Sequence, residues 1–212
     1  MSNPTVQNVP TSAAEAAKIV PRAEFRVFGH GLIAGIGARI WNGKTVLSQA
    51  RTMPTETYVL SRQTSAANVK VRDGLLDIKV KTGETPEGYE VFQPRGKFQF
   101  PVGREELAAI LAHLQVTAAL EAQTYSFEDF VALVRRHPDL AAVQVDKTRH
   151  GFTIDGAICE YAEVYFNGAL LESACVESAD YAVMRDVIDG LGLASLPNVN
   201  YLAAAKRVVG MA

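Results

Sequence analysis

Alternating apolar and polar residues predict the strands of this chain. The clearest alternation surrounds Asp73-Gly74, a pair typical of a two-residue hairpin turn. Apolar residues recur at every second position on both sides of it, at Val69, Val71, Leu76, Ile78 and Val80. A second turn of the same kind, Asn167-Gly168, joins two alternating runs near the end of the chain. The pattern predicts two β-hairpins.

Shorter alternations and helical periods fill the rest of the chain. Further strands are predicted at 24–28, 57–60, 96–100, 142–149, 152–154, 158–166 and 169–177. Helices are predicted at 32–40, 103–115, 126–136, 180–191 and 201–209. Because the strands occur in two groups of hairpins and not as βαβ repeats, we expect an α+β fold with an antiparallel, tunnel-like β-barrel and flanking helices. We expect a disordered tail over 1–20 and a single domain over 21–212.

Composition and charge narrow the class of protein. The chain has 212 residues, of which 48% are hydrophobic, and 21 basic residues against 23 acidic residues give a net charge of −2. This balance argues against a sequence-independent nucleic-acid binder. Two cysteines cannot build a disulfide framework, and no apolar run is long enough to span a membrane. We therefore expect a cytoplasmic protein with neither a nucleic-acid nor a membrane partner; a homodimer is left open.

The two hairpin turns fix which side chains share a face. The Asp73-Gly74 turn puts Lys70 opposite Asp77 and gives one basic face and one apolar face. The Asn167-Gly168 turn puts Glu163 opposite Glu172, and two like charges in this position repel unless a cation compensates them.

Both polar faces could simply meet water. Alternatively, they could line one concave surface whose basic residues are Arg26, Lys70, Arg72, Lys79, Lys147 and Arg149. Such a surface suits a metal-bridged polyphosphate.

Several short motifs resemble the CYTH, or triphosphate tunnel metalloenzyme, superfamily. The resemblance rests on the strands 68–72 and 76–80, the segment Val145-Asp146-Lys147-Thr148-Arg149, the acidic stretch Glu172-Ser173-Ala174, and Leu191-Gly192-Leu193 before the last helix. They cover most of residues 24–209 in order. The resemblance implies a barrel of eight antiparallel strands that binds a triphosphate together with a divalent metal.

The resemblance also implies which residues form the site. The expected ligand is an anionic small molecule such as a triphosphate, bound by the six basic residues named above. Mg²⁺ or Mn²⁺ would be held by Glu24, Glu163 and Glu172, and the reaction would be hydrolysis of a triphosphate by metal-positioned water. The family's first strand reads E-x-E-x-K, whereas this chain has Glu24-Phe25-Arg26-Val27-Phe28. The alternative is therefore a non-catalytic binding or scaffold protein with a reshaped tunnel.

Other motifs give weaker evidence of function. Gly29-His30-Gly31-Leu32-Ile33-Ala34 matches a short dinucleotide-binding pattern, but hairpins follow it in place of βαβ units. The four histidines are spread along the chain without a helical ligand spacing, and no nucleophilic serine or cysteine stands out.

Overall fold

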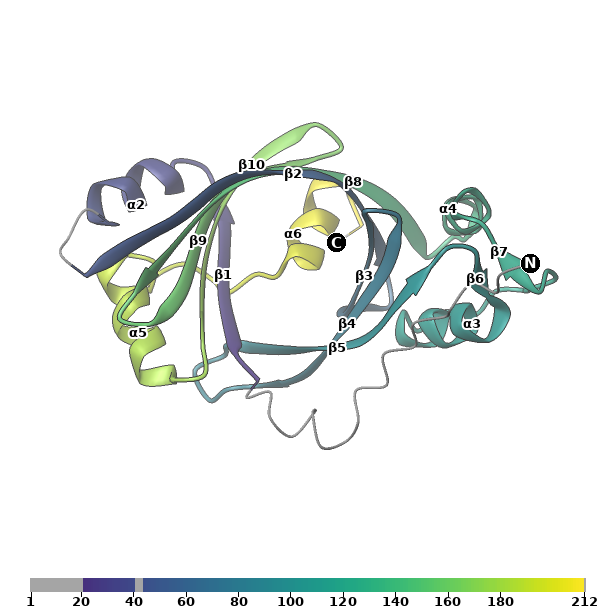
Figure 1. Ribbon diagram of the computed structural model, residues 1–212, viewed down its shortest axis with the longest axis horizontal. Helices are drawn as coiled ribbons and strands as arrows, with labels where there is room; N and C mark the ends of the chain where they lie inside the picture. Colours follow the sequence, from purple (N-terminus) through teal and green to yellow (C-terminus); the bar gives the residue numbers. More distant parts are fainter. Residues whose placement is uncertain (1–20, 41–43, 212) are drawn as a thin grey trace, which may run out of the picture.

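Eight strands close into one antiparallel barrel (Figure 1). The computed structural model describes residues 21–40 and 44–211, so the predicted tail at 1–20 lies outside the described residues. In barrel order the strands are β1 (Ala23–Gly29), β10 (Ala169–Ser178), β9 (Ala157–Phe166), β8 (Leu140–Ile154), β2 (Thr45–Ser61), β3 (Thr64–Arg72), β4 (Leu75–Glu84) and β5 (Glu90–Gln99). The predicted α+β fold with an antiparallel barrel is confirmed.

Both predicted hairpins form with the predicted registers. Lys70 pairs with Asp77 across β3 and β4, and Glu163 pairs with Glu172 across β9 and β10. At each turn both central residues have positive φ, 51° and 72° at Asp73-Gly74 and 49° and 86° at Asn167-Gly168. These are the backbone values that a two-residue turn of this type requires, which is why Asn or Asp followed by Gly is a reliable signal.

Two strands are longer than the sequence pattern predicts. The strand predicted at 57–60 is the end of β2, whose first half contains mostly polar residues that conceal the alternation. The strands predicted at 142–149 and 152–154 are one strand, β8, which continues through His150-Gly151 and pairs with β2 along most of its length. Pro54 lies in β2 where the register shifts between Met53 and Glu56, so a bulge accommodates it.

Helices cover the outside of the barrel on two opposite sides (Figure 1). On one side α2 (Leu32–Ile40) and α5 (Tyr181–Gly190) bury apolar residues of β1, β9 and β10. On the other side α3 (Arg104–His113) and α4 (Phe127–Arg136), with the small sheet of β6 (Val102–Gly103) and β7 (Thr124–Tyr125), cover β2, β3, β4 and β8. Among the described residues, no helix has the length and apolar character needed to cross a membrane.

The last helix, α6 (Tyr201–Val208), lies within the ring of strands (Figure 1). Its apolar residues pack against Tyr58, Val145 and Val164, which point inward from β2, β8 and β9. The ammonium of Lys206 donates hydrogen bonds to the Thr64 carbonyl and the Ser65 hydroxyl at 2.8 and 2.9 Å. Half of the barrel interior is therefore an apolar core, and the other half is lined by polar side chains.

A short segment completes the closure of the barrel. β1 and β5 pair only through Ala23 with Val91 and Glu24 with Glu90. Beyond that point the residues before α6 connect the two strands, and we call Asn198, Val199 and Asn200 the 198–200 clip. The Val199 amide donates to the Arg26 carbonyl at 2.7 Å, and the Asn198 amide group donates to the Gly88 carbonyl at 2.7 Å. The clip thus ties β1 to the chain that enters β5.

Candidate functional site

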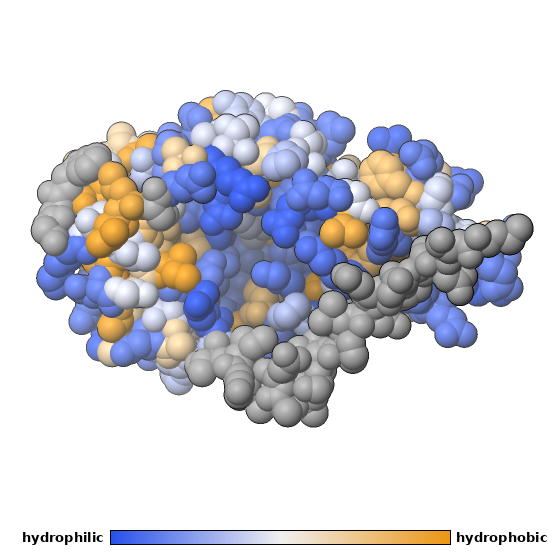
Figure 2. Space-filling model, in the orientation of Figure 1, coloured by the Kyte–Doolittle hydropathy of each residue, from blue (hydrophilic) through white to orange (hydrophobic). Residues whose placement is uncertain are grey.

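The interior face collects all six basic residues that the sequence selected. On β3, Lys70 and Arg72 alternate with Val69 and Val71, which are buried under α3 and α4 on the outside. The same alternation turns Lys79, Arg26, Lys147 and Arg149 inward. Figure 2 shows a hollow lined by hydrophilic residues in the middle of the ring. The predicted basic face is therefore the wall of the barrel interior.

Three of these cations surround one buried carboxylate, and we call Glu56, Lys70, Arg72 and Lys147 the Glu56 cluster. Glu56, on β2, has no solvent-exposed surface. Its oxygens lie 2.9 Å from Lys70 Nζ, 2.8 Å from Lys147 Nζ and 3.6 Å from Arg72 Nη1. Glu56 is thus shared by three cations, of which Arg72 has a second carboxylate partner in Asp77.

Burial and neighbouring charges shift the pKa values of the members of the Glu56 cluster. Burial and the neighbouring Lys147 ammonium lower the pKa of Lys70 to about 8, although Glu56 opposes the shift. Burial also lowers the pKa of Lys147. Burial alone would raise the pKa of Glu56, yet Lys147 and Lys70 hold it below its usual value. An anion placed here would meet cations that lack a full complement of negative charge.

Toward β4 and β5 the basic wall continues with side chains that reach water. Asp77 lies 3.3 Å from Arg72 Nη2 and 3.6 Å from Lys97 Nζ, and the Lys97 side chain is half exposed. Lys79 is exposed, and among the residues that the structure describes no hydrogen bond or ion pair joins its ammonium. These cations are the accessible part of the interior.

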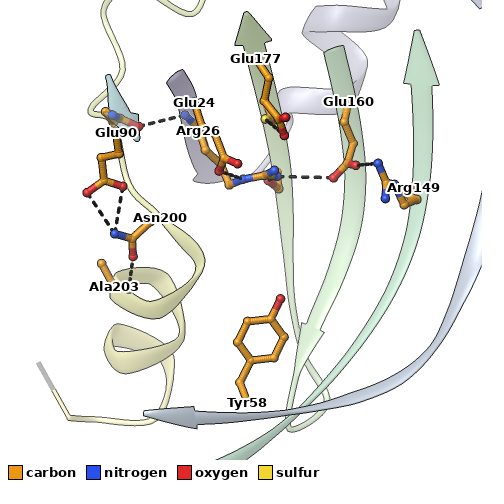
Figure 3. A network of polar contacts seen from close by, with 12 residues as sticks. Glu24, Arg26, Tyr58, Glu90, Arg149, Glu160, Glu177, Asn200 and Ala203 are labelled. Atoms are coloured by element: carbon orange, nitrogen blue, oxygen red, sulfur yellow. Dashed lines mark hydrogen bonds and ion pairs between the residues drawn. The ribbon is translucent and has the colours of Figure 1, made fainter. Parts of the chain in front are cut away.

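A second polar group contains Arg26, Glu24 and Glu160 (Figure 3), and with Ser173 we call it the Arg26 cluster. Arg26 Nε donates to Glu24 Oε1 at 2.7 Å, and Arg26 Nη1 lies 3.0 Å from Ser173 Oγ and 3.4 Å from Glu160 Oε1. The other oxygen of Glu160 forms an ion pair with Arg149. Nε and Nη1 of Arg26 therefore have partners supplied by β1, β9 and β10.

Aromatic rings from α6 and β2 form the boundary between the polar and the apolar halves. The Arg26 guanidinium lies 4.7 Å from the centre of the Tyr201 ring, and Lys147 Nζ lies 5.1 Å from it. Lys70 Nζ lies 5.2 Å from the centre of the Tyr58 ring. The two rings stack with centroids 5.8 Å apart. Such cation–π contacts hold the three cations at the floor of the polar half.

The predicted metal ligands are not brought together. Glu24 points into the interior, whereas Glu163 is exposed on the outer face of β9 between Ala162 and Val164, which are buried inside. Glu172 is also on the outside, where its carboxylate accepts a hydrogen bond from the Ile33 amide at the start of α2 at 2.8 Å. The wall of the barrel separates Glu24 from the other two, so the three carboxylates cannot share one ion.

The acidic stretch that faces β1 lies further along the chain than the resemblance indicated. Glu24 pairs with Glu177 and Arg26 pairs with Cys175, so Cys175-Val176-Glu177 takes the place expected of Glu172-Ser173-Ala174. Among the described residues, Glu24, Cys175 and Glu177 form the group whose potential ligand atoms lie within 4.8 Å of one another.

This group does not fit Mg²⁺ or Mn²⁺. Burial raises the pKa of Cys175 well above its usual value, so the sulfur keeps its proton, and it lies 3.7 Å from Glu177 Oε1 as a donor. A thiol is a poor ligand for a hard cation that prefers oxygen. Glu24 is in an ion pair with Arg26. Burial and the Glu24 charge raise the pKa of Glu177, although Arg26 and Lys79 oppose the shift, so this carboxyl keeps its proton more readily and is a weaker metal ligand.

The sequence did not reveal Glu56, Glu160 or Tyr201 as site residues. Glu56 lies two positions before Tyr58 in the same inward-facing series, but Pro54 interrupts the pattern there. Glu160 lies on a face with Ala162, Val164 and Phe166, and that face looked apolar. The one usable signal was that Arg149 and Glu160 lie on predicted strands of the same group.

Comparisons with known proteins identify similar structures and no similar sequences. No family model matches the chain, and no curated protein is significantly similar to it. A conserved hypothetical protein from Pyrococcus furiosus is 13% identical, covers 85% of this chain and 98% of its own, and has a TM-score of 0.47. A Pyrococcus horikoshii protein is 14% identical, covers 84% of this chain and 97% of its own, and has a TM-score of 0.48.

A third similar structure is a candidate adenylyl cyclase from Hippeastrum, for which a dominant triphosphatase activity is described. It is 10% identical, covers 89% of this chain and 95% of its own, and has a TM-score of 0.47. Structures described as candidate adenylyl cyclases, one of them with a dominant triphosphatase activity, are thus among the structural neighbours. At these identities and TM-scores, the similarity concerns the course of the chain alone.

Proposed function

We propose that the barrel interior binds a polyphosphate, or a small molecule that carries one, directly through its cations. The observation that carries this proposal is the Glu56 cluster, in which Lys70 and Lys147 share the Glu56 carboxylate with Arg72, and Asp77 is a second partner of Arg72 alone among the three. Cations that are partly desolvated and undercompensated attract an anion more strongly than the same cations on an open surface. The ligand would supply the negative charge that the cluster lacks.

The geometry favours a ligand with several charged oxygens over a single carboxylate. The basic side chains come from β3, β4, β5 and β8, so they surround the interior from several directions. Arginine binds phosphate through a planar fork, and lysine acts as a compact point charge; this wall contains both. A chain of phosphates could contact the buried Glu56 cluster at one end and the exposed Lys79 and Lys97 at the other.

Thermal unfolding with and without inorganic tripolyphosphate tests the proposal. A ligand that binds only the folded state stabilises it by about 2.7 kcal/mol at a hundred times its dissociation constant. We expect tripolyphosphate to raise the melting temperature of the wild-type protein more than orthophosphate does. The Arg72→Ala/Arg149→Ala double variant should lose most of this shift.

The matched control is Arg135→Ala/Arg136→Ala, which removes the same charge from the exposed end of α4 on the outside of the barrel. It should keep the full shift. An equal loss of the melting-temperature shift in both double variants would mean that tripolyphosphate binding depends only on the net charge of the protein. This result would refute the site. Release of phosphate during the same incubation, with Mg²⁺ added, would show that the bound ligand is also hydrolysed.

A further inference from the structure

Carboxylates from three strands converge on the Arg26 guanidinium. Glu24 lies two residues from Arg26 on β1, Glu160 reaches it from β9, and Glu177 lies on β10 beside Cys175, the residue that pairs with Arg26. Figure 3 shows Glu24, Glu160 and Glu177 around the same point. Carboxylates that approach one another in a buried site repel unless a cation lies among them. In this cluster the central cation belongs to the chain.

Contacts to both the side chain and the backbone of Arg26 fix its position. Its side chain is 6% exposed, its polar atoms contact Glu24, Glu160 and Ser173, and its guanidinium lies over the Tyr201 ring. Its backbone is fixed as well, because its amide donates to Asn198 Oδ1 at 2.9 Å and its carbonyl accepts from the Val199 amide. The guanidinium cannot leave the carboxylates without breaking its contacts to Ser173 on β10, Glu160 on β9 and the Tyr201 ring, while the 198–200 clip fixes the backbone that carries it.

We infer that the Arg26 guanidinium permanently occupies the place of a divalent cation in this carboxylate cluster, so that the wild-type interior has no site for Mg²⁺ or Mn²⁺ there. A divalent ion would have to displace a guanidinium that is already paired, buried and hydrogen-bonded. Replacing Arg26 by a carboxylate would have the opposite effect. It would remove the resident cation and place a further carboxylate among Glu24, Glu160 and Glu177, an oxygen-rich set that suits Mn²⁺.

The test is direct binding of Mn²⁺ to the metal-free protein. Binding is measured as the decrease of the electron paramagnetic resonance signal of free Mn²⁺. The wild-type protein should leave this signal unchanged, whereas Arg26→Glu should bind one Mn²⁺ per chain. The melting temperature of Arg26→Glu should be well below that of the wild type in EDTA and should rise when Mn²⁺ is added. The wild-type melting temperature should not respond to Mn²⁺.

Arg149→Glu is the matched control. It makes the same change of charge at the other partner of Glu160, but it leaves Arg26 among the carboxylates. It should bind no Mn²⁺. Binding of Mn²⁺ by Arg149→Glu as tight as by Arg26→Glu would overturn the inference, because any added carboxylate would then suffice.

Mn²⁺ binding to the wild-type protein tests the inference even if Arg26→Glu fails to fold. Stoichiometric Mn²⁺ binding by the wild-type protein that is lost in Glu24→Gln would show an ion sharing the cluster with Arg26, and would overturn it. A folded Arg26→Glu that binds no Mn²⁺ would also overturn it. None of these measurements uses tripolyphosphate, so the inference about Arg26 and the proposed anion binding can fail independently.

Discussion

Arg26 Nε lies 2.7 Å from Glu24 Oε1, and both side chains point inward from β1. Alternate residues of a strand share a face, so this contact is a consequence of strand geometry. It places a positive charge supplied by the chain between Glu24 and Glu160. The contact makes Arg26 a fixed part of the polar interior.

The first prediction concerns the counter-ion of the basic wall. Glu56→Gln keeps the shape of the side chain and removes the only carboxylate that contacts both Lys70 and Lys147 among the described residues. Breaking a buried ion pair in this way costs about 3 to 5 kcal/mol, because the remaining charges are left unpaired. Urea denaturation should show this loss. Tripolyphosphate should then restore more stability to the variant than it adds to the wild type; a smaller gain in the variant would contradict the account.

The second prediction concerns the pH dependence of anion binding. The pKa of Lys70 is lowered to about 8, and a bound anion would raise it again. Binding near that pH should therefore take up protons, and the affinity for tripolyphosphate should fall as the pH rises through 8. Calorimetry in two buffers with different ionisation enthalpies measures the proton uptake. Lys70→Met should reduce this proton uptake, and the remainder should come from Lys147, whose pKa is also lowered.

The same lowered pKa makes a prediction for the protein without ligand. An unfolded lysine keeps its usual pKa, so between about pH 8 and 10 the unfolded chain binds more protons than the folded chain. The Lys70 contribution therefore makes the free energy of unfolding increase with pH in this window, and it is constant below the window. Urea denaturation gives the free energy of unfolding of the wild type and of Lys70→Met. The difference between these two free energies should depend on pH only in this range.

Most of the fold can be predicted from the sequence because turn residues and strand alternation are local signals. Asp73-Gly74 and Asn167-Gly168 determine their hairpins because few other residue pairs accept positive φ at two successive positions. Registers follow from the turns, and they place Lys70 and Arg72 on one face without any tertiary information. Three of the six basic residues, Lys70, Arg72 and Lys79, could therefore be assigned to one face from the Asp73-Gly74 turn alone.

The inner and outer faces of β9 and β10 could not be assigned in the same way. In most sheets the apolar face packs on a core and the polar face meets water. Here α6 enters the barrel, so the inward face of β9 changes from Glu160 to Ala162, Val164 and Phe166 along one strand. That face looked apolar, and Glu163 and Glu172 were consequently placed inside. Only the position of α6, a long-range feature, reveals the true orientation.

The third prediction tests that orientation. Glu163 is exposed and lies directly opposite Glu172 on the outside of the barrel. Glu163→Gln removes a like-charge pair, so it should increase the free energy of unfolding by about 0.2 to 1 kcal/mol. Its response to tripolyphosphate should equal that of the wild type. A loss of tripolyphosphate binding in Glu163→Gln would place this carboxylate in the site and contradict the structure.

The fourth prediction concerns the 198–200 clip. Asn200 Oδ1 accepts from the Ala203 amide and caps α6, while Asn200 Nδ2 donates to both oxygens of Glu90 at 3.1 and 3.0 Å. Asn200→Asp keeps the cap but places a second carboxylate against Glu90, so it should cost about 1 to 3 kcal/mol. In a double-mutant cycle, Glu90→Gln should recover most of this loss. Additive effects would mean that the clip does not link α6 to β5.

The central claim is that the interior binds a polyphosphate through the protein's own cations. Isothermal titration of tripolyphosphate into the wild-type protein in EDTA tests it most directly. The account predicts one ligand per chain, an affinity that falls with rising salt, and binding in EDTA at least as tight as in excess Mg²⁺. Binding that requires Mg²⁺ and disappears in EDTA would contradict it.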